Sequence, residues 1–510
     1  MFRSKFAYAV AACCAAPAIT HASSLVPPVV QPSPLTLQIR EVATLEYDRG
    51  SRYNIAAPVT VGGQIYVADQ FNGDVYRRNG TGFDRVFDGD ITPPDGLELS
   101  GTNRIINVSR GGTDDTLYVA FTVRGPDPTD LPDIDVRPLP SPVIEPCCDP
   151  SRDIDIYRVG TDAEDAIGVT SSTDLQIIYR YDLDPVTGTL DSSDPTPIVA
   201  LEVQNGGRAH PGGGMLTLPD GRLLFATGDN LPTGTNGRRA AQDEGEHVSK
   251  LLIIDPEADR DARVTVAAKG LRNTQSLQYT DASQTAVAFG DIGGGIAEEI
   301  NMVGVADLLD TTTVESFGWG EASGGRAREG TFYIGPGAAY GGFGPVALGE
   351  APLSEAGFLQ PYAQVGREGA PFVAVTGPVT LATSFDTIVS VFSDLSLGRL
   401  YGTTAPLSDI NAPVFDVRLI DMDGDLTSLR ELGARNPNVL GRAEPRFFKF
   451  ADGTAGVLLE RTGGIYALTQ VANVPLPASG LLLGAGILVF AVSRRRATQT
   501  RSADTRVQEI

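Results

Sequence analysis

Cysteine is scarce in this sequence, and its distribution excludes a fold stapled by disulfides. Four cysteines occur in 510 residues, as adjacent pairs at positions 13–14 and 147–148. Neighbouring cysteines can form a strained vicinal disulfide or a bridge to another chain, and neither would hold the fold together. Cys147 and Cys148 have no histidine or further cysteine nearby in the sequence, which makes them a poor metal site. We interpret this pair as structural or incidental.

Positive charge is also in short supply. The 40 lysine and arginine residues are outnumbered by 63 aspartate and glutamate residues, which gives a net charge of −23. This balance argues against nucleic acid and anionic membrane surfaces as partners, because both repel an acidic protein. It suits a secreted, soluble protein, and acidic side chains can coordinate hard cations such as calcium.

Long helical patterns are missing as well, and short apolar strands take their place. The 58 glycines, 35 prolines and many short runs of valine, isoleucine and tyrosine predict an all-β fold. Six apolar cores, most of them a strand, a turn and a second strand, begin at Gln64, Thr116, Arg222, Thr285, Thr387 and Gly456. Units of this kind cannot bury their own faces, so they stack in a ring whose inner strands line a channel. We therefore predict a six-bladed β-propeller over residues 53–470, in preference to an array of β-sandwiches.

Two segments stand apart from this strand pattern. The Pro-rich residues 23–52 are predicted to be a leader into the first blade. Residues 125–155, rich in proline and aspartate, are predicted to be a loop insertion, since strand pairing resumes after them. A segment of this composition cannot form a core, so we expect a surface loop.

The N-terminal residues 1–22 have the features of a secretory signal peptide. A basic start is followed by a short apolar run and a small-residue cleavage site near residues 20–22. Residues 10–13 also resemble a lipoprotein cleavage box. The apolar run before Cys13 is short and a second anchor exists, so simple cleavage is favoured.

The C-terminal residues 474–496 combine the sequence VPLPASG, a short apolar run and three arginines. An apolar run this short barely crosses a bilayer, and the arginines would keep residues 497–510 in the cytoplasm. The segment resembles the PEP-CTERM sorting signal in its VPLPA variant, which implies processing by an exosortase after transient anchoring in the membrane. An ordinary membrane anchor is the alternative. Both place the main domain outside the cytoplasm, in the periplasm, at the cell surface or in the exterior.

The most informative stretch is residues 206–230, which contain His210. The chain has 3 histidines, and the one at position 21 would leave with the signal peptide. Apolar runs on both sides of Pro219-Asp220-Gly221 predict a hairpin, because glycine accepts the positive φ of a tight turn. His210 would then lie on a glycine-rich loop that leads into a rigid sheet, where a catalytic group is well placed. A lone histidine can equally be a surface or core residue without chemistry.

Several short motifs occur in an order that resembles a known family. They lie at residues 99–108, 115–122, 210–213, 219–221, 228–229, 241–243, 249–256, 270–277, 298–301 and 317–319. As a set they resemble the pyrroloquinoline-quinone (PQQ)-dependent sugar dehydrogenases, the glucose/sorbosone dehydrogenase family, which are six-bladed propellers of the bacterial envelope. The resemblance covers residues 53–470. It implies an oxidoreductase that oxidises a sugar or related hydroxyl compound, uses PQQ and calcium, and passes electrons to an acceptor in the envelope.

The resemblance also implies residue roles. Alcohol oxidation by a quinone requires a base for the hydroxyl proton and charged partners for the cofactor. His210 matches the family's catalytic base. Arg272 and Asn273 match a pair that contacts cofactor oxygens, and a guanidinium fork suits an ortho-quinone and carboxylates. Arg446 is a further candidate for cofactor binding. The alternative for Arg272 and Asn273 is an ordinary surface turn.

Residues 291–301, DIGGGIAEEIN, are the candidate calcium loop. Calcium takes about six to eight oxygen ligands, which carboxylates and backbone carbonyls can supply. The family motif implies that the carbonyls of Gly293 and Gly294 face a calcium ion that polarises the quinone. It implies that Glu299 holds an adjacent structural calcium, with Glu298 where an aspartate is usual. Paired glutamates are otherwise typical of a solvated acidic turn.

The sequence departs from the family pattern at three places. Ala209 stands where glucose-oxidising members carry an orienting aspartate, and Thr102 lies near the place of an expected glutamine. The usual arginine pair before the last Asp-Gly turn is out of register, with Arg442 and Arg446 on either side of it. The quinoprotein hypothesis therefore has an alternative, a catalytically inactive propeller that binds carbohydrate or matrix at the cell surface. A calcium-dependent lactonase is a third hypothesis, since one fold can host several chemistries, but its ring of acidic ligands is not evident.

Overall fold

The computed structural model describes residues 30, 36–46, 55–88, 105–113, 115–124, 143–145, 154–157, 174–193, 195–203, 210–229, 241–259, 262–294, 296–310, 312–320, 327–334, 347–350, 357–366, 375–381, 389–433 and 443–470. The predicted signal peptide at residues 1–22, the predicted sorting segment at 474–496, residues 497–510 and the Cys147–Cys148 pair lie outside these residues. Within the described part of the chain, no helix is both long and apolar enough to span a membrane.

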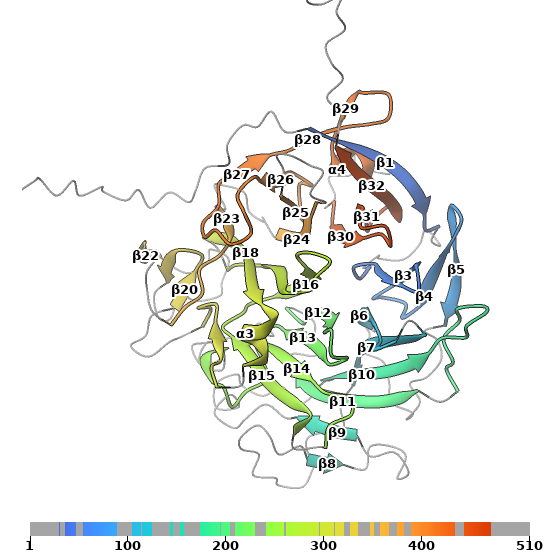
Figure 1. Ribbon diagram of the computed structural model, residues 1–510, viewed down its shortest axis with the longest axis vertical. Coiled ribbons are helices and arrows are strands. Elements are labelled where there is room, and N and C mark those ends of the chain that lie inside the picture. Colours follow the sequence, from blue (N-terminus) through green and yellow to red (C-terminus); the bar gives the residue numbers. More distant parts are fainter. Residues whose placement is uncertain are drawn as a thin grey trace, which may run out of the picture.

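Six sheets are arranged around a central axis, as Figure 1 shows, which confirms the predicted all-β, six-bladed β-propeller. The first blade contains β2 (Val59–Val61), β3 (Gln64–Ala68), β4 (Val75–Asn79) and β5 (Gly82–Phe87). The second contains β6 (Ile105–Arg110), β7 (Thr116–Arg124), β10 (Asp174–Asp182) and β11 (Thr196–Val203). The third contains β12 (Gly212–Thr217), β13 (Leu223–Thr227), β14 (Lys250–Ile254) and β15 (Val264–Lys269), with β19 (Glu315–Ser316) at its edge.

The remaining blades follow the same plan. The fourth contains β16 (Thr274–Tyr279), β17 (Ala286–Asp291), β18 (Ala297–Gly304) and β23 (Ala363–Gly366). The fifth contains β24 (Val375–Thr380), β25 (Ser390–Asp394), β26 (Leu400–Thr403) and β27 (Val414–Asp416). The sixth contains β30 (Pro445–Lys449), β31 (Ala455–Leu459), β32 (Gly464–Gln470) and β1 (Thr36–Thr44), followed by β28 (Arg418–Ile420) and β29 (Leu426–Thr427). A three-stranded sheet of β20 (Ala327–Glu329), β21 (Phe332–Ile334) and β22 (Ala347–Glu350) and the short helices α3 (Val305–Leu309) and α4 (Leu429–Gly433) lie outside this pattern.

The strand pairs found in the sequence are the two middle strands of the blades rather than the strands at the channel. The pairs that begin at Gln64, Thr116 and Arg222 correspond to β3–β4, β7–β10 and β13–β14. The channel is instead lined by the first strand of each blade, since β2, β6, β12, β16, β24 and β30 contact one another in a closed ring. The middle strands could be recognised in the sequence because they are buried on both faces and therefore form continuous apolar runs. All five residues of β13, for example, are buried.

The ring is closed by a strand from the predicted leader, which corrects the assignment of residues 23–52. β1 pairs antiparallel with β32 over much of its length and so joins the start of the chain to the last blade, as the adjacent blue and red strands in Figure 1 show. Leu37 and Ile39 of β1 are buried in the core of the sixth blade. Because a propeller leaves an open edge unless its first and last blades are joined, β1 belongs to the fold.

The insertion predicted at residues 125–155 is partly strand. β8 (Val143–Glu145) pairs with β9 (Ile154–Tyr157), and β9 pairs in parallel with β11 at the outer edge of the second blade. The insertion therefore extends this blade outward, which a loop assignment missed. The residues between these strands lie outside the described part of the chain.

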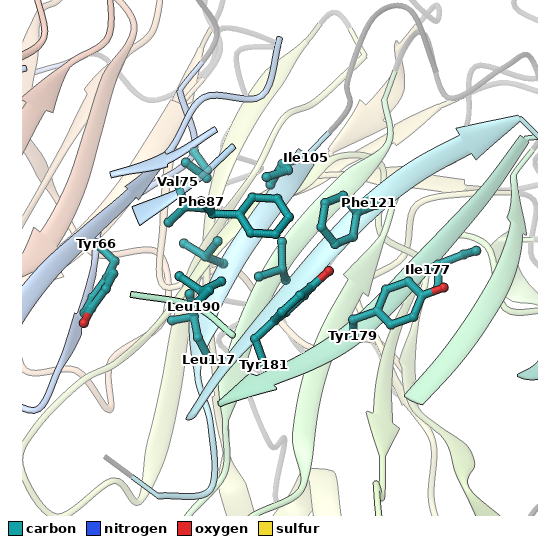
Figure 2. Packing of buried hydrophobic residues seen from close by; sticks show 14 of the residues in the cluster. Tyr66, Val75, Phe87, Ile105, Leu117, Phe121, Ile177, Tyr179, Tyr181 and Leu190 are labelled. Carbon is teal, nitrogen blue, oxygen red and sulfur yellow. The ribbon is translucent and has the colours of Figure 1, made fainter. Parts of the chain in front are cut away.

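Neighbouring blades are held together by apolar side chains that interdigitate between their faces. Figure 2 shows the cluster between the first and second blades, where Phe87 meets Phe121 and Tyr181. The ring centroids of Phe87 and Tyr181 lie 5.4 Å apart in an edge-to-face arrangement, a favourable geometry for aromatic pairs. This packing fixes the position of each blade relative to the next, and with it the loops at the ends of the strands.

Ring closure by β1 gives a first prediction. Ile39→Ala should lower the free energy of unfolding by about 2–5 kcal/mol, because it leaves a cavity between β1 and the rest of the sixth blade. Arg40→Ala is the matched control, since Arg40 is the exposed neighbour in the same strand. The measurement is the denaturant midpoint of the full chain. Equal midpoints for the two variants would contradict the assignment of β1 to the propeller.

Candidate functional site

The predicted site residues gather at one end of the ring. At this end, called the His210 end below, the first strand of each blade begins and the second strand ends. His210 precedes β12, Arg272 and Asn273 precede β16, and Arg446 is the second residue of β30. The glycine-rich segment with Gly293 follows β17. Loops that are far apart in the sequence therefore meet at the axis of the propeller, which is where such folds carry their sites.

His210 is oriented by Asp229. The predicted hairpin is present as β12 and β13, and its register pairs Gly212 with Thr227, so the residue before β12 lies beside the residue after β13. His210 Nδ1 is 2.7 Å from Asp229 Oδ1. The Asp229 side chain is 1% exposed and that of His210 is 16% exposed, so the carboxylate is buried behind an imidazole that solvent can still reach.

Arg272 lies on the other side of the imidazole. Its Nη2 is 3.1 Å from His210 Nε2, and its Nη1 donates to the carbonyl of Ile292 at 2.8 Å. A guanidinium only donates hydrogen bonds, so Nε2 must accept and the proton of the neutral ring must be on Nδ1, facing Asp229. In the resulting row of Asp229, His210 and Arg272, the basic nitrogen of the histidine faces the guanidinium.

The direction of Arg272 is set by a buried carboxylate, Asp291. The backbone N–H groups of Arg272 and Asn273 donate to Asp291 at 2.9 and 2.8 Å, and the Thr274 hydroxyl donates at 3.2 Å. Burial raises the pKa of Asp291 to about 6, against the opposing effect of these hydrogen bonds. Asp291 thereby fixes the turn that carries both Arg272 and Asn273, which excludes the alternative of an ordinary surface turn.

Trp319 forms the wall on which Arg272 lies. The Arg272 guanidinium carbon is 5.5 Å from the centroid of the indole, and Trp319 is 3% exposed. The Trp319 carbonyl accepts from Gln242 Nε2 at 2.6 Å. The loop that carries Gln242 is in turn fixed by Lys250, whose Nζ donates to the carbonyls of Ala241 and Val248 at 3.2 and 2.7 Å. The fully buried Lys250 thus stabilises the loop that holds Trp319 in place.

The candidate calcium loop contains more buried acid than the sequence indicated. Glu298 Oε2 accepts from the Gly293 N–H at 3.1 Å, and Glu299 accepts from the Gly330 N–H and from Asn301 Nδ2. Burial, together with the charge of Asp291, raises the pKa of Glu299 to about 7. These glutamates are buried, so the alternative of a solvated acidic turn is wrong.

A further acid, Glu329 of β20, packs against the same loop. Its Oε1 accepts from the N–H groups of Ile296 and Ala297 at 2.6 and 2.9 Å. A Cβ atom on Gly294 would lie 2.8 Å from the Trp319 indole and 3.2 Å from Glu329 Oε2, so only glycine fits between them. No motif in the sequence pointed to Glu329, because β20 belongs to a small sheet outside the repeated blades.

The donor set of this loop fits a hard divalent cation. Asn301 Oδ1 is buried and accepts no hydrogen bond from any residue that the structure describes, so this oxygen is available as a cation ligand. No three Asp, Glu, His or Cys side chains of the described residues converge enough to hold a metal alone. Calcium would therefore need Asn301 and backbone carbonyls, among them those of Gly293 and Gly294, beside the carboxylate of Glu299.

Arg446 reaches the His210 end but is engaged by protein groups. Its guanidinium donates to Gln275 Oε1 at 2.7 Å and to the Ile55 carbonyl at 3.2 Å, and it lies 3.3 Å from Glu460 Oε2. Burial raises the pKa of Glu460 well above its usual value. Arg446 thus ties the sixth blade to the first and fourth, and a ligand carboxylate would compete with Glu460 for it.

For a planar quinone with acidic groups, the described residues therefore offer free partners to the quinone oxygens but not to the acidic groups. Arg272 and Asn273 can serve the quinone oxygens, and Arg272 Nε is buried without a partner among the described residues. For the acidic groups the described part of the chain offers Arg446, shared with Glu460. Ala209, Thr102 and Arg442, where the sequence departs from the family pattern, lie outside the described residues.

Comparison with known proteins shows the fold alone. No protein-family model matches the sequence, and no curated protein matches it either. Among solved structures, the soluble aldose sugar dehydrogenase of Escherichia coli in its apo form is similar, with 15% identity and a TM-score of 0.50 over 86% of this chain and 100% of that chain. The PQQ-bound aldose sugar dehydrogenase of Streptomyces coelicolor has 14% identity and a TM-score of 0.47 over 86% of this chain and 99% of that one.

Lys250 gives a prediction about pH. Burial lowers its pKa to about 7, whereas a lysine of the unfolded chain has a pKa of about 10.4. Between these values the unfolded chain holds a proton that the folded chain lacks, so the stability due to this group rises with pH. Lys250→Met should therefore destabilise the protein more at pH 9 than at pH 7, by about 1–3 kcal/mol.

The matched control for this prediction is Lys269→Met, which removes a lysine whose side chain reaches solvent and pairs with Glu244. Denaturant midpoints of both variants and of the unsubstituted chain at the two pH values give the comparison. If the loss of stability in Lys250→Met is the same at both pH values, Lys250 is not buried as a neutral amine.

Proposed function

We propose that this protein is an exported quinoprotein oxidoreductase that oxidises a sugar or related hydroxyl compound, with PQQ as its cofactor and His210 as the base. The observation that carries this proposal is the row of Asp229, His210 and Arg272, with Nδ1 and Nε2 of one imidazole held at 2.7 and 3.1 Å. The fold shared with an aldose sugar dehydrogenase is compatible with it.

The chemistry follows from the protonation state of His210. Its Nε2 lone pair takes the proton of the substrate hydroxyl once the hydroxyl replaces Arg272 at that nitrogen. The Asp229 carboxylate, held on Nδ1–H, then stabilises the imidazolium. When bound, the quinone supplies the electrophilic carbon that accepts the hydride from the substrate carbon. The substrate thereby loses a hydride and a proton and becomes the carbonyl compound or lactone.

Arg272 and Asn273 would hold the quinone end of the cofactor, and Arg446 its acidic end. Carbonyl oxygens of Gly293 and Gly294 would face one calcium ion, and Glu298, Glu299 and Asn301 would hold an adjacent one. We further propose, from the sequence, export by the N-terminal signal, exosortase processing at the C-terminal segment and an electron acceptor in the envelope. The acidic composition supports a location outside the cytoplasm and gives no support for nucleic acid as a partner.

Dye reduction tests the enzyme. The full chain, reconstituted with PQQ and calcium, should reduce an artificial electron acceptor in the presence of some member of a panel of aldoses, polyols and sugar acids. His210→Ala should lower kcat by about 100- to 10 000-fold, because the hydroxyl proton loses its acceptor. Asp229→Asn should act in the same direction, since it removes the charge that stabilises the imidazolium.

The matched control is Arg222→Ala, in the exposed turn at the far end of the same hairpin, where Arg222 pairs with Asp220. It should retain the activity of the unsubstituted chain. Saturable quinone binding without turnover of any compound would favour the alternative of an inactive propeller at the cell surface, for which the capture of Arg446 by Glu460 is the specific observation. Equal activity of His210→Ala and Arg222→Ala would exclude His210 as the base.

Calcium binding gives an independent prediction. Calcium should raise the thermal unfolding midpoint of the chain by several degrees relative to chelator, because it binds the folded state and relieves the repulsion between buried carboxylates. Glu299→Gln should remove most of this increase. Glu257→Gln, which alters an exposed acid paired with Arg180, should retain it. A midpoint that does not respond to calcium in the unsubstituted chain would refute the cation site.

A further inference from the structure

The backbone around His210 adopts an unusual conformation. His210 has φ of 51°, in the left-handed region, and Gly212 and Gly213 follow with φ of 71° and 98°. A non-glycine residue in this region costs on the order of 1–3 kcal/mol and persists only where its surroundings impose it. Residue 211 is a proline, which restricts His210 further. The direction of the imidazole therefore depends on whatever holds residues 211–213.

Three buried amide side chains hold this segment from both neighbouring blades. Gln176 Nε2 of the second blade donates to the Pro211 carbonyl at 3.0 Å. Asn107 Nδ2, also of the second blade, donates to the Gly213 carbonyl at 2.7 Å. From the fourth blade, Asn273 Oδ1 accepts from the Gly212 N–H at 3.2 Å. Three consecutive residues after His210 are thus each fixed by one amide.

Contacts within the β12–β13 hairpin also restrain residues 211–213. The Gly228 N–H donates to the Pro211 carbonyl at 3.3 Å, so Pro211 accepts from two sides. A Cβ atom on Gly228 would lie 1.8 Å from the His210 carbonyl oxygen, and one on Gly213 would lie 2.1 Å from Ile106 Cγ2. The segment therefore has no free space into which it could relax without moving its neighbours.

Burying the amide side chains of Asn107 and Gln176 in the second blade costs free energy that filling the core does not explain. Gln176 is 0% exposed and Asn107 is 4% exposed, in a blade whose interior, apart from Ser109 and Thr122, is aliphatic and aromatic. An amide buried in such surroundings costs free energy unless its groups are hydrogen-bonded. Gln176 Oε1 has no hydrogen-bond partner in the part of the chain described, so the bond from Nε2 to Pro211 is the side-chain hydrogen bond that Gln176 makes there. An apolar side chain of the same size would fill the space better.

We infer that Asn107 and Gln176 are positioning residues for His210: they fix the backbone of residues 211–213, and this backbone aims the imidazole between Asp229 and Arg272. Neither residue belongs to a blade that supplies the proposed catalytic row. The catalytic consequence of this inference rests on the proposed function, whereas the orientation of His210 does not.

Nitrogen NMR of the histidines tests the orientation directly. In the full chain labelled with 15N-histidine, the His210 signals, assigned with His210→Gln, should report a neutral ring protonated at Nδ1. Gln176→Met and Asn107→Leu should each mix the two tautomers or broaden these signals, because the ring loses its fixed contacts with Asp229 and Arg272. The signals of His247, a buried residue between β13 and β14, should change less than those of His210, because neither Asn107 nor Gln176 forms a hydrogen bond with it in the described part of the chain.

Thr122→Val is the matched control. Thr122 pairs with Gln176 across the second blade and is equally buried, and its hydroxyl has no hydrogen-bond partner among the residues described. Its replacement alters a buried polar group of the same blade without touching residues 211–213. The His210 signals should therefore stay as in the unsubstituted chain.

Kinetics provide the second readout. If the proposed function holds, Gln176→Met and Asn107→Leu should lower kcat about 10- to 100-fold with KM changed less than about threefold, since they misdirect the base without removing binding groups. A chain without any turnover would refute the proposed function and leave the NMR comparison to decide the positioning role. Unchanged His210 signals in both variants, or failure of both to fold, would overturn the inference in favour of a purely structural role.

Discussion

The row of hydrogen bonds from Asp229 through His210 to Arg272 is the feature on which the functional argument depends. It exists because two adjacent blades present corresponding loops at the same end of the ring, and a backbone bond from the Asp229 N–H to the Arg272 carbonyl at 2.8 Å joins these loops directly. The side-chain contacts are therefore fixed by the packing of one blade against the next. Closure of the ring by β1 is what keeps this packing rigid.

The same end of the ring concentrates buried negative charge. Burial raises the pKa of Asp291 to about 6 and that of Glu299 to about 7, against the opposing effect of the backbone N–H groups that donate to them. Glu329 packs against the same loop. Such a group of acids is unfavourable without a cation, because each charge opposes the next in a medium of low polarity. The nearby guanidinium of Arg446 does not relieve it, since Glu460 occupies that group. The acids and Arg272 together make a site suited to a cation and a polar planar ligand.

The sequence predicted the fold well because the middle strands of the blades are continuous apolar runs, buried on both faces. The strands at the channel were not recognised as the innermost ones, although the hairpin of β12 and β13 was predicted; several of them are short or contain glycine, as in the GGGMLT of β12. β1 alternates buried and partly buried residues over most of its length, yet its partner lies more than 400 residues away, so ring closure could not be read locally. In the candidate site, the motifs predicted His210 and Arg272. The role of Asp229 depends on the register of the hairpin, and the pairing of Arg446 with Glu460 depends on side-chain packing, so neither could be predicted from the sequence.

The central claim, that a planar quinone binds beside Arg272, can be measured with the single tryptophan of the chain. Trp319 lies under the Arg272 guanidinium, so its fluorescence should be quenched saturably, with one quinone per chain, when PQQ is added to the full chain in the presence of calcium. Arg272→Ala should weaken this binding at least about tenfold, a loss of about 1.4 kcal/mol. Quenching that never saturates, or that is the same in Arg272→Ala, would contradict the account.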